Sequence, residues 1–202
     1  MQLIRGFVRA ITERAWNSDM TLISALALGT IPAVFLGLWL EPMIETTFRG
    51  ANVVAFGLIA GSFVFLVAEY MQRRMPEEKS ITIQKGIIIG FFQALALIPG
   101  MSRSGMTISG GMLLGLSRAG AARFAFLLSF PVILGAGGLK LLELSASGAS
   151  ISAVGPLVLG AIVAFVSGMI AIHALITLLK TRTLMPFVVY RLVLAAAILF
   201  IL

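Results

Sequence analysis

A short polar segment, Ser102-Arg103-Ser104-Gly105, is the part of this sequence whose residue types could do chemistry. It follows a Pro99-Gly100 pair and lies within residues apolar enough to sit at membrane depth. An arginine in such a position costs roughly 2.5 to 3.5 kcal/mol on insertion scales, and intramembrane charges usually mark a ligand or ion path. We therefore predict a functional site around Arg103.

The chemistry that these residues favour is the binding of an oxyanion. The guanidinium of Arg103 can pair bidentately with phosphate or carboxylate, and it stays charged at any relevant pH. The hydroxyls of Ser102, Ser104 and Thr107 can cap a helix or bond to the ligand. Gly105 allows a close approach of the backbone. We expect Arg103, Ser102 and Ser104 to act in catalysis, and all five residues to contact the substrate.

A helix that begins after this turn adds to the same site. The first backbone amides, predicted at Met106 to Ser109, lack acceptors within the helix and favour an anion at that end. Gln93 lies one half-helix before the Pro-Gly break and is predicted to point back into the pocket as a further substrate contact. We expect a phosphate or diphosphate carried by an amphiphile, since a soluble anion has little reason to enter a membrane cavity.

Other interpretations are open for the same residues and for their polar neighbours. Ser, Thr and Gly in membrane helices often serve only packing, and Arg103 could be a structural counter-ion of Glu69. Glu69 itself is near the end of a span and is expected to snorkel. Tyr190 and Arg191 fall early in the last span, where an anchor at the interface is favoured over a place in the cavity. His173 is expected to be a packing residue rather than a proton shuttle.

The composition identifies the elements that must position this site as membrane helices. Of 202 residues, 59% are hydrophobic and only 11% are charged, and the mean hydropathy is +1.07. A soluble domain has about 25% charged residues. The net charge of +7 comes from Lys and Arg at the ends of apolar runs, as membrane topology requires, so it does not indicate nucleic-acid binding. Cysteine is absent, and no HExxH, GxSxG or Walker motif supports zinc, serine-esterase or nucleotide chemistry.

We predict an all-α, polytopic helix bundle formed by a single domain, residues 1–202, with an amphipathic lead-in at 1–20. About five apolar runs are long enough to cross a bilayer, and the basic links place the N-terminus inside. The predicted spans are 21–40, 52–71, 121–144, 153–179 and 184–202. Gly57 and Gly61 in the second span have the spacing that lets another helix pack closely.

Residues 86–117 are predicted to form a re-entrant hairpin. The runs 86–98 and 106–116 are apolar, but each is too short for a full crossing. Two half-helices joined by a polar loop are tolerated at membrane depth only where the loop is buried in protein or lines a wet cavity. Arg118 and Arg123 follow at once, as expected if the chain returns to the cytoplasmic side.

Residues 99–107, PGMSRSGMT, resemble the PGxSRSGxT signature of the bacitracin-resistance type undecaprenyl-diphosphate phosphatases. The likeness extends from about Thr21 to the C-terminus. It implies a multi-pass enzyme of the bacterial inner membrane that hydrolyses undecaprenyl diphosphate to undecaprenyl phosphate and phosphate. Such an enzyme recycles the lipid carrier for peptidoglycan synthesis, supports cell wall biogenesis and cell shape, and confers bacitracin resistance. The implied partners are the lipid substrate and the membrane, with a homodimer as one assembly and no nucleic acid.

The resemblance also implies parts that this sequence does not show. Family members carry a second half-site, in which paired glutamates precede a Pro-x-Ser-Ser-Thr-Gly-His type loop and are expected to hold a divalent cation, Mg²⁺ or Ca²⁺. No such segment lies before Thr21. We expect the present half to hold the diphosphate. The alternative to an enzyme is a truncated or non-catalytic homologue that binds or translocates a lipid-linked phosphate or diphosphate.

Overall fold

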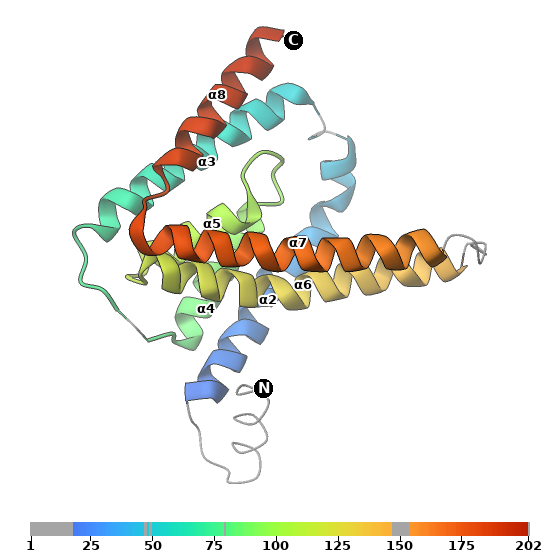
Figure 1. Cartoon of the computed structure of the whole chain (residues 1–202), viewed down its shortest axis with the longest axis horizontal. Coiled ribbons are helices and arrows are strands. Elements are labelled where there is room, and N and C mark those ends of the chain that lie inside the picture. The colour runs from blue at the N-terminus through green and yellow to red at the C-terminus, as the bar shows by residue number, and fades with distance from the viewer. Residues whose placement is uncertain (1–17, 47, 49, 79, 147–153, 202) are drawn as a thin grey trace.

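The computed structural model describes residues 18–46, 48, 50–78, 80–146 and 154–201 (Figure 1). Within these ranges all regular structure is helical, so the predicted all-α class is confirmed. The expected lead-in at 1–20 lies almost wholly outside the described residues. The helices are α2 (Ser18–Thr46), α3 (Ala51–Gln72), α4 (Ile83–Leu95), α5 (Arg103–Leu113), α6 (Arg118–Ala146), α7 (Val154–Thr181) and α8 (Met185–Ile201).

Four of these helices, α2, α3, α6 and α7, are long and apolar enough to cross a membrane. The fifth predicted crossing corresponds to α8, which has 17 residues and is about 26 Å long at the α-helical rise, slightly short of a bilayer core of about 30 Å. The helices α6 and α7 contact each other over part of their length, whereas α3 and α8 lie side by side across the other part of the bundle in Figure 1. The polytopic bundle is therefore confirmed.

The predicted re-entrant hairpin is formed by α4 and α5. These helices have 13 and 11 residues, which correspond to only about 20 and 17 Å. The backbone N–H of Glu78, before the hairpin, donates to the carbonyl of Gly115, directly after it, at 2.8 Å. Because this bond joins the two ends of the hairpin, the chain enters and leaves at the same end of the bundle.

Local signals in the sequence define the ends of the hairpin. Thr82 caps α4, since its Oγ1 accepts the N–H of Lys85 at 3.2 Å. The side chain of Lys85 also bonds to Glu78 and holds the pKa of that carboxyl below its usual value. At the other end, Gly115 has a φ of +87° and closes α5 with a bond from its N–H to the carbonyl of Met112. This left-handed position favours glycine.

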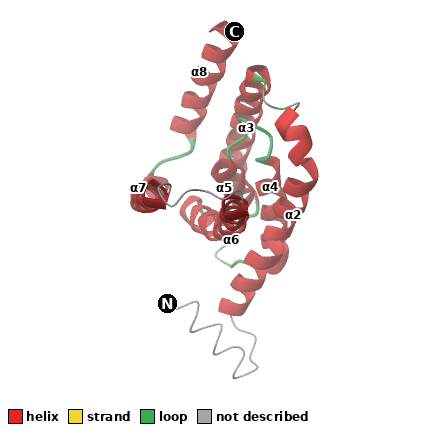
Figure 2. Cartoon of the chain, turned by 90° about the vertical axis from the view of Figure 1, so that its right-hand side faces the viewer, coloured by secondary structure: helices red, strands yellow, loops and turns green. Residues whose placement is uncertain are grey.

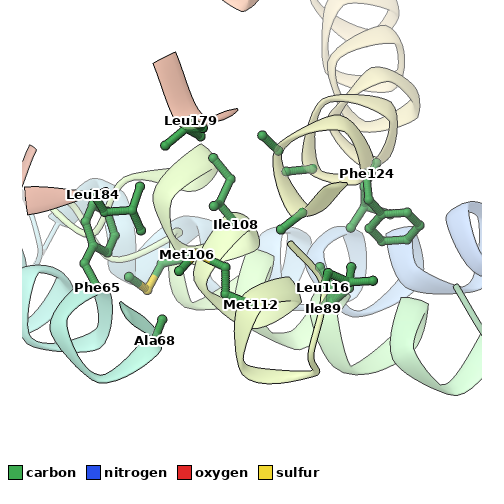
Figure 3. Close-up of a cluster of buried hydrophobic side chains, with 14 of the residues drawn as sticks. Phe65, Ala68, Ile89, Met106, Ile108, Met112, Leu116, Phe124, Leu179 and Leu184 are labelled. Carbon is green, nitrogen blue, oxygen red and sulfur yellow. The ribbon is translucent and has the colours of Figure 1, made fainter. Parts of the chain in front are cut away.

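The core of the bundle is built around α5. Met106, Ile108 and Met112 are almost fully buried and lie among side chains from α3, α4, α6 and the α7–α8 turn (Figure 3). Behind this cluster, α4 packs tightly on α2, where a Cβ on Gly90 would overlap the carbonyl of Gly29. The half-length helix α5 is thus enclosed by protein on most sides. A polar loop at membrane depth, such as the one before α5, requires such an enclosure.

Candidate functional site

The tip of the hairpin, residues 99–102, lies directly against α3. A Cβ on Gly57 would be 2.1 Å from the carbonyl oxygen of Pro99. Gly100 has a φ of +91° and lies against the same part of α3, close to the carbonyl of Val54. The glycine spacing in α3 was expected to admit another helix. Instead, Gly57 accommodates the re-entrant loop, and Gly61 accommodates the side chain of Arg191 together with the carbonyl of Met101.

Replacing Gly57 by alanine should therefore displace the tip. The added methyl overlaps backbone rather than a flexible side chain, so we expect a loss of about 1 to 3 kcal/mol of stability. Misplacement of the site by about 1 Å should reduce any activity that depends on Ser102 by about 10²-fold. Gly160→Ala in α7 is the matched control, because a Cβ there meets nothing within 4 Å. Equal thermal midpoints and activities for the two variants would contradict this account.

The N-terminus of α5 follows directly after the tip of the hairpin and carries backbone amides without a backbone acceptor in the described part of the chain. Ser102 has a φ of +73° and caps the helix, because its Oγ accepts the N–H of Gly105 at 3.3 Å. Its carbonyl accepts the N–H of Met106 at 2.9 Å. The prediction that the amides of Met106 to Ser109 are free was therefore wrong. The helix begins at Arg103, and the N–H groups of Arg103 and Ser104 have no backbone acceptor among the described residues.

A pocket of about 160 Å³ opens beside this helix end. Its walls come from α3, from the start of α5, from α7, from the α7–α8 turn and from α8, helices whose arrangement Figure 2 shows. The polar lining residues are Ser102, Ser104, Tyr190 and Arg191. The remaining lining residues are Gly105 and the apolar Phe65, Ile108, Leu175, Leu184 and Phe187. The pocket thus combines hydroxyls and a cation with apolar walls, a composition that suits the head group of an amphiphile.

The structure brings only some of the predicted site residues to this pocket. Ser102, Ser104 and Gly105 line it. Arg103 is exposed next to them, and its side chain makes no hydrogen bond or ion pair with the rest of the described chain. Thr107 is buried, and its hydroxyl donates to the carbonyl of Arg103 at 2.7 Å. Thr107 therefore braces the first turn of α5.

Gln93 does not line the pocket. It is 2% exposed on α4, and neither of its amide atoms has a hydrogen-bond partner among the described residues. Its place as a substrate contact remains a prediction from the sequence.

The sequence interpretation placed Arg191 wrongly. It was expected to anchor at the interface, yet it is only 6% exposed and forms part of the pocket wall, whereas the neighbouring Tyr190 is exposed and lines the same pocket. The available signal was an arginine inside the apolar run of α8, which is the same criterion that identified Arg103.

Glu69 is also buried rather than snorkelling. Its carboxylate accepts hydrogen bonds from Nε and Nη2 of Arg118 at 2.8 and 2.5 Å, and from the backbone N–H of Leu184 at 2.7 Å. Glu69 is thus the counter-ion of Arg118 and not of Arg103. These bonds join the end of α3, the start of α6 and the α7–α8 turn, directly beside the pocket lined by Leu184.

The described residues do not form a metal centre. No group of three or more His, Cys, Asp or Glu side chains that could hold an ion is found among them. The pocket lining contains hydroxyls and a guanidinium but no carboxylate, and oxygen ligands that include carboxylates are what Mg²⁺ and Ca²⁺ require. The residues that line the pocket therefore do not fit a divalent cation by themselves.

Comparison with known proteins identifies the family of this chain. The family described as bacitracin resistance protein BacA matches residues 1–197. An undecaprenyl-diphosphatase of Thioalkalivibrio sulfidiphilus is 44% identical over 192 residues, which cover 95% of this chain and 72% of the relative. Undecaprenyl-diphosphatase 2 of Stutzerimonas stutzeri is 40% identical, covering 98% and 74%, and an undecaprenyl-diphosphatase of a Nostoc species is 39% identical, covering 98% and 63%. The chain belongs to the BacA family of bacitracin resistance proteins.

Proposed function

We propose that this protein is a membrane phosphatase that hydrolyses undecaprenyl diphosphate to undecaprenyl phosphate and phosphate. The observation that carries the proposal is the end of the re-entrant hairpin, where Ser102, Ser104 and the free amides of α5 meet a cation-lined pocket in a membrane bundle. The relatives named undecaprenyl-diphosphatase support the choice of substrate. The product is the lipid carrier for peptidoglycan precursors, and its recycling at the bacterial inner membrane accounts for bacitracin resistance.

In the proposed reaction, the oxygen of a water molecule attacks the terminal phosphorus. The bond from that phosphorus to the bridging oxygen breaks, and the bridging oxygen leaves with undecaprenyl phosphate. Positioning and charge neutralisation carry most of the catalysis of phosphoryl transfer. Arg103 and the amides of α5 would neutralise the phosphate oxygens, while the hydroxyls of Ser102 and Ser104 donate to them. The Oγ of Ser102 accepts from Gly105 and keeps its own proton for the ligand.

The base that activates the water is not among the residues that line the pocket. His173 lies exposed on α7 and is not part of the lining, and Glu69 is occupied by Arg118 and Leu184. Nucleophilic hydroxyls also need an adjacent base, so we assign the serines to binding. A divalent cation, Mg²⁺ or Ca²⁺, would add to the neutralisation with carboxylates from outside the described lining, and a homodimer is one assembly that could supply them.

The direct test is the release of phosphate from undecaprenyl diphosphate by the purified chain in detergent. We expect release by the unaltered chain and by Arg123→Ala, which changes an exposed arginine of α6 outside the pocket lining. We expect a strong loss in Arg103→Ala. Binding of the diphosphate without any release of phosphate would refute hydrolysis and support the alternative of a lipid-diphosphate carrier.

A further inference from the structure

Arg191 has an unusual environment for an arginine. It is the one arginine among the described residues that is buried, at 6% exposure, and its guanidinium stacks 4.9 Å from the centre of the Phe65 ring. The same ring lies so close to Gly105 that a Cβ there would overlap it. A single side chain, that of Phe65, therefore contacts both Arg191 and the start of α5.

Part of the guanidinium is committed to the protein. Nε donates to Ser62 Oγ at 3.2 Å. Nη2 donates to the carbonyls of Gly57, Leu58 and Gly100 at 3.3, 3.2 and 2.8 Å. These bonds connect α8 to α3 and to the tip of the re-entrant loop.

The other part of the guanidinium is free. Nη1 makes no hydrogen bond with any described residue, and it is not among the buried polar atoms without a partner. Arg191 lines the pocket, and because Nη1 is not fully enclosed, its two N–H donors remain open to a ligand. The N–H groups of Nη1 are therefore free to donate hydrogen bonds to an anionic oxygen.

The charge of Arg191 is not compensated either. No carboxylate lies within 4.0 Å of it in the described part of the chain, where Glu69 pairs with Arg118. The surrounding acceptors are neutral carbonyls and a hydroxyl. A buried cation without a counter-ion is costly, and a ligand anion would relieve that cost.

We propose that Arg191 is a phosphate-binding residue that gives the site its preference for a diphosphate over a monophosphate. One phosphate binds to Arg103 and the amides at the start of α5, and the other binds to Nη1 of Arg191. The two cations come from α5 and α8, and we infer that a head group with two phosphates engages both, whereas a single phosphate engages one. This inference rests on the proposed function, because it concerns the same pocket and the same class of substrate.

The test measures the affinity of the full chain in detergent for farnesyl diphosphate and for farnesyl phosphate, by titration calorimetry at fixed ionic strength. The unaltered chain should prefer the diphosphate. Arg191→Gln should lower diphosphate affinity by about 10- to 100-fold, the effect of losing hydrogen bonds to a charged group, with little change for the monophosphate. Arg123→Gln is the matched control and should change neither affinity.

A purely structural role predicts a different result. If Arg191 only positions the loop, its loss misplaces Ser102, and both affinities fall in parallel. Arg191→Lys covers the case in which the glutamine variant does not fold, because the ammonium can still donate to the carbonyls of Gly57 and Gly100 but cannot present Nη1 to the pocket. A reduced preference in this variant supports the proposal, and an unchanged preference overturns it.

The outcomes also separate this inference from the proposed function. Selective diphosphate binding without phosphate release would refute the proposed enzymatic function and would support the role of Arg191. Phosphate release together with an unchanged preference for the diphosphate in both Arg191 variants would refute the role of Arg191 and would support the enzymatic function. An unaltered chain with no preference for the diphosphate would overturn the inference directly.

Discussion

Replacing Arg103 by alanine is expected to lower phosphate release from undecaprenyl diphosphate by about 10²- to 10³-fold, the range found when one preorganised donor to a developing oxyanion is removed. The side chain is exposed and makes no hydrogen bond or ion pair with other described residues. Its loss should therefore leave the fold unchanged. Phosphate release by purified variants in detergent, together with the thermal midpoint of each, measures both effects.

Arg103→Lys refines this prediction. A lysine keeps the charge but loses the planar fork that matches a phosphate bidentately, so its activity should fall between those of the unaltered chain and the alanine variant. Arg123→Ala is the control for the loss of a surface cation. Similar activities for Arg103→Ala and Arg123→Ala would show that Arg103 does not contact the substrate.

The second large effect is expected from Glu69, through stability. Glu69 is 4% exposed, and its carboxylate accepts hydrogen bonds from both Arg118 and the N–H of Leu184. Glu69→Ala leaves a half-buried guanidinium and a backbone donor without their partner, which typically costs about 3 to 5 kcal/mol. We expect a markedly lower thermal midpoint in detergent and a weakened junction of α3, α6 and the α7–α8 turn.

A double variant tests the cause. Replacing both partners of a buried ion pair by apolar residues is often tolerated, so Glu69→Met with Arg118→Leu should be more stable than Glu69→Ala with Arg118 retained. Glu143→Ala breaks the exposed pair with Lys140 at 2.8 Å and should change stability by no more than about 0.5 kcal/mol. If Glu143→Ala destabilises the protein as much as Glu69→Ala, the burial of the Glu69–Arg118 pair is not the reason for its contribution to stability.

Much of the site could be predicted because its signals are local. The PGMSRSGMT segment combines a break, a cap, a cation and a helix start within nine consecutive residues. The lengths of α4 and α5 also follow from their short apolar runs. The bond from Glu78 to Gly115 shows that these two helices form a hairpin whose ends lie together. The start of α5 was misplaced, because Ser102 caps the helix at a positive φ that is uncommon for a residue other than glycine.

The sequence by itself determined the membrane class, the hairpin and the anion-binding character of its tip, because each depends on composition or on neighbours within one turn. Only the tertiary structure decided how Arg191 and Glu69 are used. Arg191 bonds to Ser62 across 129 positions, and Glu69 bonds to Leu184 across 115. A charged residue in an apolar run must find a partner, but the identity of that partner depends on which helices pack together. The packing of α8 on α3 thus brings Arg191 to the pocket beside Ser102 and Ser104.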